Sequence, residues 1–338
     1  MSRLMIYGAA GYTGRMAAAR AKAAGLDVVL AGRDEVPLRA LATVLGVEYR
    51  VFPLDIVTDV ERGLHGVTVL LNCAGPFVHT AAPLLAACLR TGTHYLDIAA
   101  ELVSYELAAA LDPDAVKAGV MLMPGSGGSV AMLGSLATRA MKQIERPRSL
   151  RIALHVTGAM SRGSATSASE QITAHCLMRR GGELVGRDPR ELRDFDFGNG
   201  ASSCFPVTLP DLITIARQSG VADIETYVHV SGIAFPDGGS EALPDGPTDQ
   251  ERAENRYHAA VEVMDADGST AYAVLDTVNG YSFTPLAAIE AARRVLAGEV
   301  RAGFQTPVDI FGSGFAESIA DTRITLQGAR VATHSKES

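Results

Sequence analysis

The stretch that decides the fold is Leu4-Met5-Ile6-Tyr7-Gly8-Ala9-Ala10-Gly11-Tyr12-Thr13-Gly14-Arg15, an apolar segment that runs into a glycine-rich turn. The run Leu4–Tyr7 predicts a buried parallel strand, and Thr13 to Ala24 predicts the helix that follows it. The glycines have the spacing G-x-x-G-x-x-G, a variant of the dinucleotide-binding fingerprint. A strand, a glycine turn and a helix in this order place free N–H groups and a positive dipole end where a phosphate can bind.

Each glycine of the turn has its own expected task. Gly8 permits the tight turn, Gly11 lets the backbone approach a pyrophosphate, and Gly14 lets the helix pack against the strand. The ring of Tyr12 either covers the nicotinamide or simply packs. The candidate cofactor-binding residues of this segment are Gly8, Ala10, Gly11, Tyr12, Thr13 and Gly14.

Arg33 indicates which dinucleotide is bound. The second expected strand, Asp27–Ala31, ends at Gly32-Arg33, where an NAD site would place a ribose-binding acid. A guanidinium there suits a 2′-phosphate and can stack on adenine, so we expect NADP(H). Two alternatives stay open: Asp34 holds a ribose hydroxyl, or Arg33 is only a solvated side chain.

Length and composition limit the classes of function. A chain of 338 residues predicts two domains, and a net charge of −8 argues against a broad nucleic-acid surface. No apolar run has transmembrane length. The four cysteines are scattered without paired spacing, which fits reduced thiols in a cytoplasmic protein. The eight histidines form no metal-binding pattern, so we expect no metal.

The first part of the chain alternates strands and helices, which predicts a Rossmann-type doubly wound parallel sheet in a domain of residues 1–128. Its expected strands are Leu4–Tyr7, Asp27–Ala31, Tyr49–Pro53, Val67–Leu71, His94–Ile98 and Val120–Met123.

The pattern changes in residues 129–280, for which we predict a mixed α/β domain that binds substrate and forms a homodimer. Its clearest element is the hairpin of Tyr257–Met264 and Thr270–Val278. We also expect a helix over Ser164–Arg180 that ends at Gly181-Gly182, and a loop over Gly238–Pro247. In the C-terminal segment, residues 281–338, Thr284 predicts the N-cap of a helix that reaches Leu296, with Pro285 at its first position. We expect this helix to pack back on the first domain.

Three motifs in this order resemble the saccharopine dehydrogenase-like NADP-binding oxidoreductases, including their trans-acting enoyl reductase branch. They are the turn Gly8–Gly14, the segment Asn72-Cys73-Ala74-Gly75-Pro76-Phe77 and the segment from Thr93 to Glu101. The resemblance implies a Rossmann domain, a mixed second domain and oxidoreductase activity, without implying one substrate. Where the family usually carries Gly-Phe-Asp and then Pro-Asp, this chain has Gly125-Ser126-Gly127-Gly128-Ser129. We therefore do not expect activity on saccharopine itself.

The loop after the fourth strand is the expected place of the nicotinamide. Ala74, Gly75, Pro76 and Phe77 end that strand beside the switch point and bring few bulky side chains, although an ordinary turn would look similar. Asp55 ends the third strand, where it either lies near the adenine or caps a helix.

Two titratable residues are candidates for chemistry. His79 follows the presumed nicotinamide loop and suits a general acid, or it is merely an exposed or capping histidine. Asp97 orients the substrate, or it is a buried acid that ties two loops together. Ser161, Arg162 and Ser164 either contact an anionic substrate or cap a helix.

These observations favour an NADP(H)-dependent oxidoreductase that transfers a hydride to or from a small carbonyl, imine or enoyl substrate. The alternative is a redox sensor that binds NADP(H) without turnover.

Overall fold

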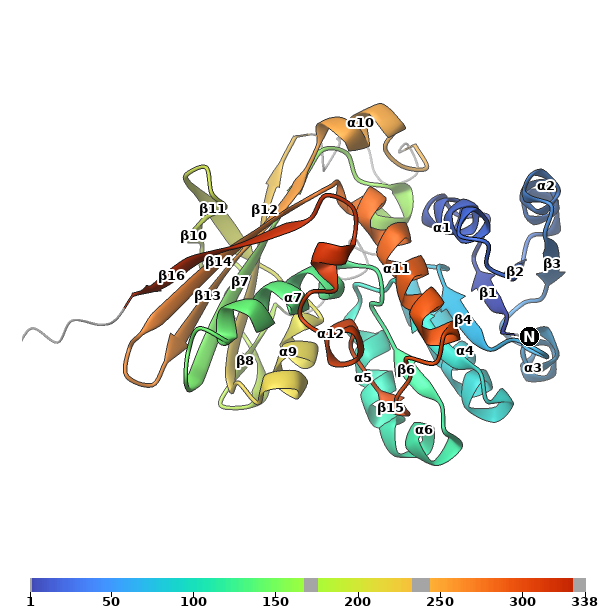
Figure 1. The fold of residues 1–338 in the computed structure, drawn as a ribbon, viewed down its shortest axis with the longest axis horizontal. Coiled ribbons are helices and arrows are strands. Elements are labelled where there is room, and N and C mark those ends of the chain that lie inside the picture. The colour runs from blue at the N-terminus through green and yellow to red at the C-terminus, as the bar shows by residue number, and fades with distance from the viewer. Residues whose placement is uncertain (1, 167–175, 233–243, 331–338) are drawn as a thin grey trace, which may run out of the picture.

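The structure is a computed structural model that describes residues 2–166, 176–232 and 244–330. Two sheets lie side by side with helices between them, as Figure 1 shows. One cluster of buried side chains runs from Leu4 and Ile6 in the first sheet to Leu150 and Val261 in the second. The two halves of the chain therefore share a continuous core.

The first sheet is parallel and has the strand order β15-β6-β5-β4-β1-β2-β3. This confirms the doubly wound sheet. The order reverses between β1 and β4, which makes that place the switch point where ligands bind such sheets. The strands are β1 (Leu4–Tyr7), β2 (Val28–Gly32), β3 (Glu48–Val51), β4 (Val69–Asn72), β5 (His94–Asp97), β6 (Met121–Met123) and β15 (Gly303–Phe304).

Helices cover both faces of this sheet, so its central strands are buried on both sides; all four residues of β1 and of β4 are buried. The helices are α1 (Tyr12–Ala23), α2 (Glu35–Leu45), α3 (Val57–Gly63), α4 (Phe77–Thr91), α5 (Leu102–Ala110) and α6 (Asp112–Ala118). The sequence predicted six strands; β15 is a seventh and comes from the C-terminal segment.

The second sheet is mixed, with the order β10-β11-β12-β7-β13-β14-β16; off this path β8 pairs with β12, and β9 pairs with β8. β12 and β7 pair in parallel, and β7, β13, β14 and β16 continue antiparallel. The strands are β7 (Pro147–Thr157), β8 (Leu177–Arg180), β9 (Glu183–Gly186), β10 (Arg193–Asp196), β11 (Ala201–Pro206), β12 (Asp223–Ser231), β13 (Tyr257–Asp265), β14 (Thr270–Thr277) and β16 (Arg323–Arg330).

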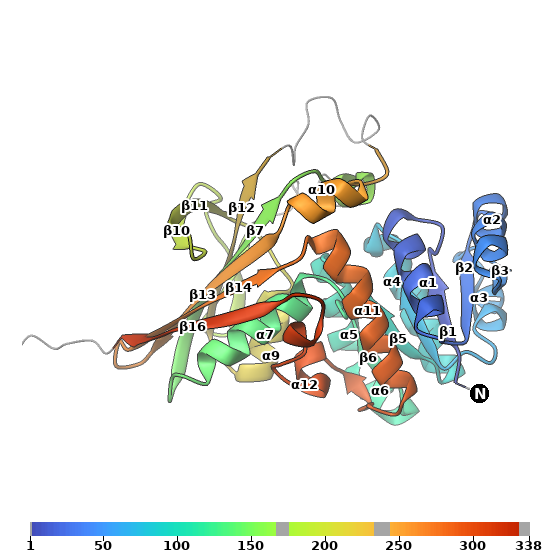
Figure 2. The ribbon, with the colours of Figure 1, turned by 45° about the horizontal axis from the view of Figure 1, so that its top comes forward.

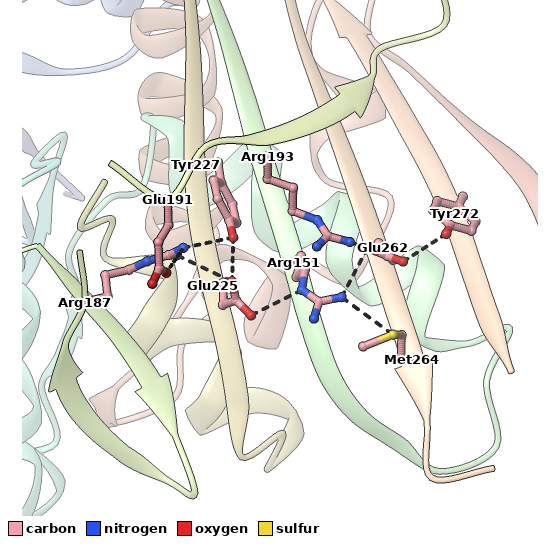
Figure 3. A network of polar contacts seen from close by, with 9 residues as sticks. All are labelled: Arg151, Arg187, Glu191, Arg193, Glu225, Tyr227, Glu262, Met264 and Tyr272. Carbon is pink, nitrogen blue, oxygen red and sulfur yellow. Dashed lines mark hydrogen bonds and ion pairs between the residues drawn. The ribbon is translucent and has the colours of Figure 1, made fainter. Parts of the chain in front are cut away.

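The two faces of this sheet differ. One face packs on α7 (Ser129–Met141) and α9 (Asp211–Ser219), which lie between the sheets in Figure 1. The other face carries a row of charged side chains, shown in Figure 3. There the guanidinium of Arg151 lies between two carboxylates: its nitrogens are 3.2 Å from an oxygen of Glu225 on β12 and 3.5 Å from an oxygen of Glu262 on β13. The hydroxyl of Tyr272 donates to the other oxygen of Glu262. Cross-strand register places these residues opposite one another.

The helix predicted over Ser164–Arg180 is wrong at its C-terminal end. Residues 162–166 are helical, residues 167–175 lie outside the described residues, and Leu177–Arg180 is the strand β8. The pair Gly181-Gly182, expected to end a helix, is instead the two-residue turn of the hairpin β8–β9. Both glycines have positive φ, 58° and 87°, as such turns require.

The helix predicted from Thr284 begins earlier, as α11 (Gly280–Leu296). Its N-cap is Asn279, whose side chain accepts the N–H of Tyr281 at 3.0 Å, and Pro285 lies inside the helix. An amide side chain at the cap outweighs the preference of proline for the first position. α11 lies along α1 (Figure 1), and it also contacts β4 and β5.

Further short elements in the described ranges are α10 (Asp249–Glu254), α12 (Pro307–Phe311) and a 3₁₀ turn (Ala316–Ser318). The predicted loop Gly238–Pro247 lies outside the described residues up to position 243. Within the ranges described, no helix has both the length and the apolar character needed to cross a membrane. The domain boundaries at residues 128 and 280 stay a prediction.

Candidate functional site

The glycine-rich turn joins β1 to α1 and packs very tightly. Gly8 has a φ of +78°, which glycine adopts without strain. A Cβ on Gly8 would lie 2.7 Å from the amide nitrogen of Ala74, and one on Gly14 would lie 2.2 Å from the carbonyl oxygen of Gly8. Only glycine fits at these two positions, and the turn therefore touches the loop after β4.

Gly11, the N-cap of α1, lies beside open space. Among the described residues, a Cβ on Gly11 would meet a single atom within 4 Å, the carbonyl oxygen of Gly8 at 3.3 Å. α1 has no side-chain cap in the described part of the chain. The N–H groups of Tyr12 and Thr13, in its first turn, have no intrahelical acceptor. The turn thus leaves both room and donors for a pyrophosphate, which is how NADP would be held here.

Arg33 follows β2 at the same edge of the sheet. Its side chain is 79% exposed, and its Nε lies 3.6 Å from a carboxylate oxygen of Asp34. Burial raises the pKa of Tyr7 to about 12; Arg33 lowers it, and Asp34 and Asp55 raise it further. The charges of Arg33, Asp34 and Asp55, which follow β2 and β3, therefore act on the hydroxyl of Tyr7 at the end of β1.

Asp55 is exposed, and the N-cap of α3 is Ile56. The expectation that Asp55 caps this helix is therefore wrong, and its place beside the adenine stays a prediction.

The loop Ala74–Phe77 is fixed by the side chain of Asn72, the last residue of β4. Its Oδ1 accepts the N–H of Ala74 at 3.0 Å, and its Nδ2 donates to the hydroxyl of Thr80 at 3.1 Å. Thr80 in turn donates to the carbonyl of Ala74 at 2.7 Å. Gly75 is exposed and Phe77 is buried, so the middle of the loop faces outward next to the glycine turn.

Asp97, predicted as catalytic, is completely buried at the end of β5. One oxygen accepts the N–H groups of Ala99 and Gly125, at 2.9 and 2.7 Å, and the other accepts the hydroxyl of Tyr95 at 2.8 Å. Burial raises its pKa to about 6, against hydrogen bonds that lower it. This geometry matches the alternative of a buried acid that ties two loops together, and we do not carry Asp97 forward as a catalytic residue.

His79 lies in the first turn of α4 and is exposed. Its backbone N–H donates to the carbonyl of Pro76 at 3.2 Å, so the main chain of His79 directly follows the loop Ala74–Phe77. Because Asp97 is buried and His79 is exposed, the structure does not bring these two candidates together.

Ser161 has the capping role that the sequence left open. Its hydroxyl accepts the N–H of Ser164 at 3.1 Å, at the start of the helical residues 162–166.

Sequence reasoning missed another buried carboxylate, Asp211, at the start of α9. It is completely buried, and neither of its oxygens has a hydrogen-bond partner in the described part of the chain. The hydroxyls of Ser104 and Thr214 are buried and unpaired in the same sense. Burial raises the pKa of Asp211 to about 7. An acid after a proline is typical of an ordinary first helical turn, so no local signal indicated this burial.

Tyr105, whose hydroxyl donates to the carbonyl of Ala99 at 2.7 Å, feels the charges of these carboxylates. Burial and the charges of Asp97, Asp211 and Glu101 all raise the pKa of its hydroxyl well above the usual range. Within the described ranges, no group of three or more side chains of metal-ligating type could hold a metal ion.

Comparisons with known proteins agree with this geometry. Residues 4–123 match the family model for the saccharopine dehydrogenase NADP binding domain. The trans-acting enoyl reductase of Mycobacterium leprae (strain TN) is 34% identical over 108 residues, which are 30% of this chain and 26% of that protein. The enzyme of the same name from Mycobacterium tuberculosis (strain ATCC 25618 / H37Rv) is 32% identical over the same shares. The matches thus span about a quarter of these relatives.

Among solved structures, the apo histidine-tagged saccharopine dehydrogenase (L-Glu forming) from Saccharomyces cerevisiae has the same fold. The TM-score is 0.65 at 12% identity, over 96% of this chain and 100% of that chain. The resemblance stated from the three motifs is confirmed: the first domain is a NADP-binding domain of the saccharopine dehydrogenase type, and its cofactor is NADP.

The buried acids predict how stability depends on pH. The folded-state pKa of Asp211, about 7, lies above its ordinary value of 3.8, so the folded chain holds a proton that the unfolded chain releases. The free energy of unfolding should therefore fall as pH rises from about 4 to 7. Asp211→Asn should remove part of this fall and raise the melting temperature at pH 8 much more than at pH 4.

Glu106→Gln is the matched control, because Glu106 is an exposed carboxylate on α5, the helix that α9 contacts. Thermal unfolding of the three proteins between pH 4 and 8 gives the comparison. Equal shifts for both variants at every pH would contradict the assigned role of burial.

Proposed function

We propose that this chain, whose first domain is a NADP-binding domain of the saccharopine dehydrogenase type, is an NADP(H)-dependent oxidoreductase. It transfers a hydride to or from a small carbonyl, imine or enoyl substrate. The observation that carries the proposal is the contact between Gly8 and Ala74, where a Cβ would come within 2.7 Å of the loop backbone. That contact joins the expected phosphate turn to the expected nicotinamide loop at the switch point.

The residues have separate tasks in this proposal. The turn Gly8–Gly14 holds the pyrophosphate through backbone N–H groups, and Arg33 binds the 2′-phosphate. Ala74, Gly75, Pro76 and Phe77 support the nicotinamide. The bound cofactor supplies the hydride, so the protein needs to provide orientation and a proton.

A sensor that binds NADP(H) without turnover is the second candidate. The observation in its favour is that His79, the candidate proton donor beside the loop, is exposed and not enclosed. Steady oxidation of NADPH with a panel of carbonyl, imine and enoyl substrates separates the two functions, since a sensor would bind tightly and consume none.

Arg33→Ala should weaken the binding of NADPH much more than that of NADH, because only NADPH carries the 2′-phosphate. Loss of a charge-assisted contact costs about 1.5–3 kcal/mol, or roughly 10- to 150-fold in affinity. Fluorescence titration of both cofactors measures this, and Arg39→Ala, at an exposed arginine on α2, is the control.

An equal loss of affinity for both cofactors would refute the role of Arg33.

Gly11→Val, which fills the open space at the N-cap of α1, should abolish binding of both cofactors without unfolding the chain.

His79→Gln should lower turnover about 10²-fold, the lower limit of general acid catalysis, with little change in NADPH affinity. The exposed His65 offers a control variant, His65→Gln, whose turnover should stay at the wild-type rate. Unchanged turnover in His79→Gln would move the proton donor elsewhere.

The homodimer and the cytoplasmic location stay part of the proposal. The face of the second sheet opposite α7 and α9 carries the charged row of Figure 3, and β10 covers part of it, since Arg193 pairs with Glu262 and Phe195 packs with Ala260. A second copy would pack against the rest of this face. Sedimentation velocity at micromolar concentration should show a dimer; a monomer alone would refute it.

A further inference from the structure

Residues of the second half of the chain cover the glycine-rich turn. The hydroxyl of Tyr12 donates to the carbonyl of Pro247, and Arg252 donates to the same hydroxyl at 2.6 Å and to the same carbonyl at 2.8 Å. A Cβ on Gly246 would lie 2.6 Å from the ring of Tyr12. Residues 244–252, here called the strap, therefore lie on Tyr12 at the edge of the turn and leave Gly11 exposed. Figure 2 shows α10, whose first residues belong to the strap, between the second sheet and α1.

The strap is an ordered element in its own right. Thr248 and Glu251 form a capping box at the start of α10, which fixes the helix that carries Arg252. The ring of Tyr281, on α11, meets Tyr12 edge to face at 5.7 Å, and its hydroxyl accepts the N–H of Ser161 at 2.8 Å. Tyr281 thus connects the turn to the segment that carries Arg162.

Two arginines from distant parts of the chain meet at one carboxylate of the strap. Arg15, in the first turns of α1, lies 3.1 Å from one oxygen of Asp245, and Arg162 pairs with the other oxygen. Arg15 also donates to the carbonyl of Ala10 within the turn at 3.2 Å. Both guanidinium groups therefore lie at the edge of the expected phosphate site.

Carboxylate and phosphate oxygens are alternative partners for a guanidinium, since both accept two parallel N–H groups. A pyrophosphate on the first turn of α1 would come close to the same arginines. It would also come close to Asp245, and the two negative charges would repel. One anion or the other is favoured at this place.

We propose that Arg15 and Arg162 form a two-guanidinium site for the pyrophosphate of the dinucleotide, and that Asp245 is its internal competitor. This inference rests on the proposed function, because it assumes that the turn binds NADP(H). The strap carries the competing charge to the turn, and the dinucleotide displaces Asp245 when it binds.

The expected effect is moderate. The side chains of Arg15, Arg162 and Asp245 are 45%, 49% and 54% exposed, so solvent screens their charges. Exposed ion pairs of this kind contribute little each, so we expect roughly three- to tenfold in affinity, which is about 0.7–1.4 kcal/mol, for the two together.

Asp245→Asn keeps the shape of the side chain and removes the competing charge. It should raise the affinity for NADPH and for NADH by the same three- to tenfold, because both cofactors carry the pyrophosphate. Asp249→Asn is the matched control: it removes the same charge from the same strap, but Asp249 is 99% exposed and pairs with Arg252. Fluorescence titration and calorimetry of the full chain give the dissociation constants directly.

Arg162→Ala tests the site itself, in a double-mutant cycle with Asp245→Asn. In the Asp245→Asn background, Arg162→Ala should lower the affinity for both cofactors three- to tenfold. In the wild-type background, Arg162→Ala should lower these affinities less, because it also removes the ion pair that Asp245 makes with Arg162 in the free protein.

The inference is overturned if Asp245→Asn binds no more tightly than Asp249→Asn. It is equally overturned if the gain appears with NADPH and not with NADH, which would assign the charge to the 2′-phosphate, or if only the KM of a substrate changes. In each case the wild-type chain still binds NADPH and the proposed function stands. A wild-type chain that binds neither cofactor contradicts the proposed function as well.

Discussion

The close approach of the glycine turn to the loop after β4 is the constraint on which the rest of the site depends. With a Cβ absent from Gly8 and Gly14, α1 packs on β1, and the turn touches Ala74. Any other residue would push two backbones apart by overlap that no side-chain rotation relieves, because the opposing atoms belong to the main chain. The two candidate halves of the cofactor site are therefore adjacent as a consequence of backbone packing.

Buried polar groups hold the neighbouring strand ends in place at a cost. Asp97 connects Ala99 to Gly125, and Asn72 pins Ala74. Burying a carboxylate is unfavourable unless hydrogen bonds compensate, and three donors do so for Asp97. Asp211 lacks such donors in the described part of the chain, and its pKa rises further as a result. The chain thus keeps acids beside its candidate site at the expense of stability near neutral pH.

The sequence predicted what depends on local pattern and missed what depends on distant contacts. Six apolar segments with intervening helices were enough for the parallel sheet, and the glycine spacing was enough for the turn. The pair Gly181-Gly182 led to the wrong helix prediction over Ser164–Arg180, because two glycines can either end a helix or form the turn of a hairpin. Only the pairing of β8 with β9 distinguishes these two structures. Asp245 lies 230 positions from Arg15, and Asp211 more than 100 from Ser104. No periodicity connects such residues.

The return of the C-terminal segment explains why the turn is covered at all. α11 lies along α1, and β15 adds to the first sheet beside β6, so the chain crosses from the second sheet back to the first. Tyr281 on α11 is thereby held against Tyr12, and the segment of Ser161 is held against Tyr281. Because these contacts belong to a hydrophobic core that both sheets share, we expect little rigid-body motion of the second sheet relative to the first. Access to the turn would then be controlled most simply by the strap, whose ion pairs are half-exposed and therefore contribute little to stability.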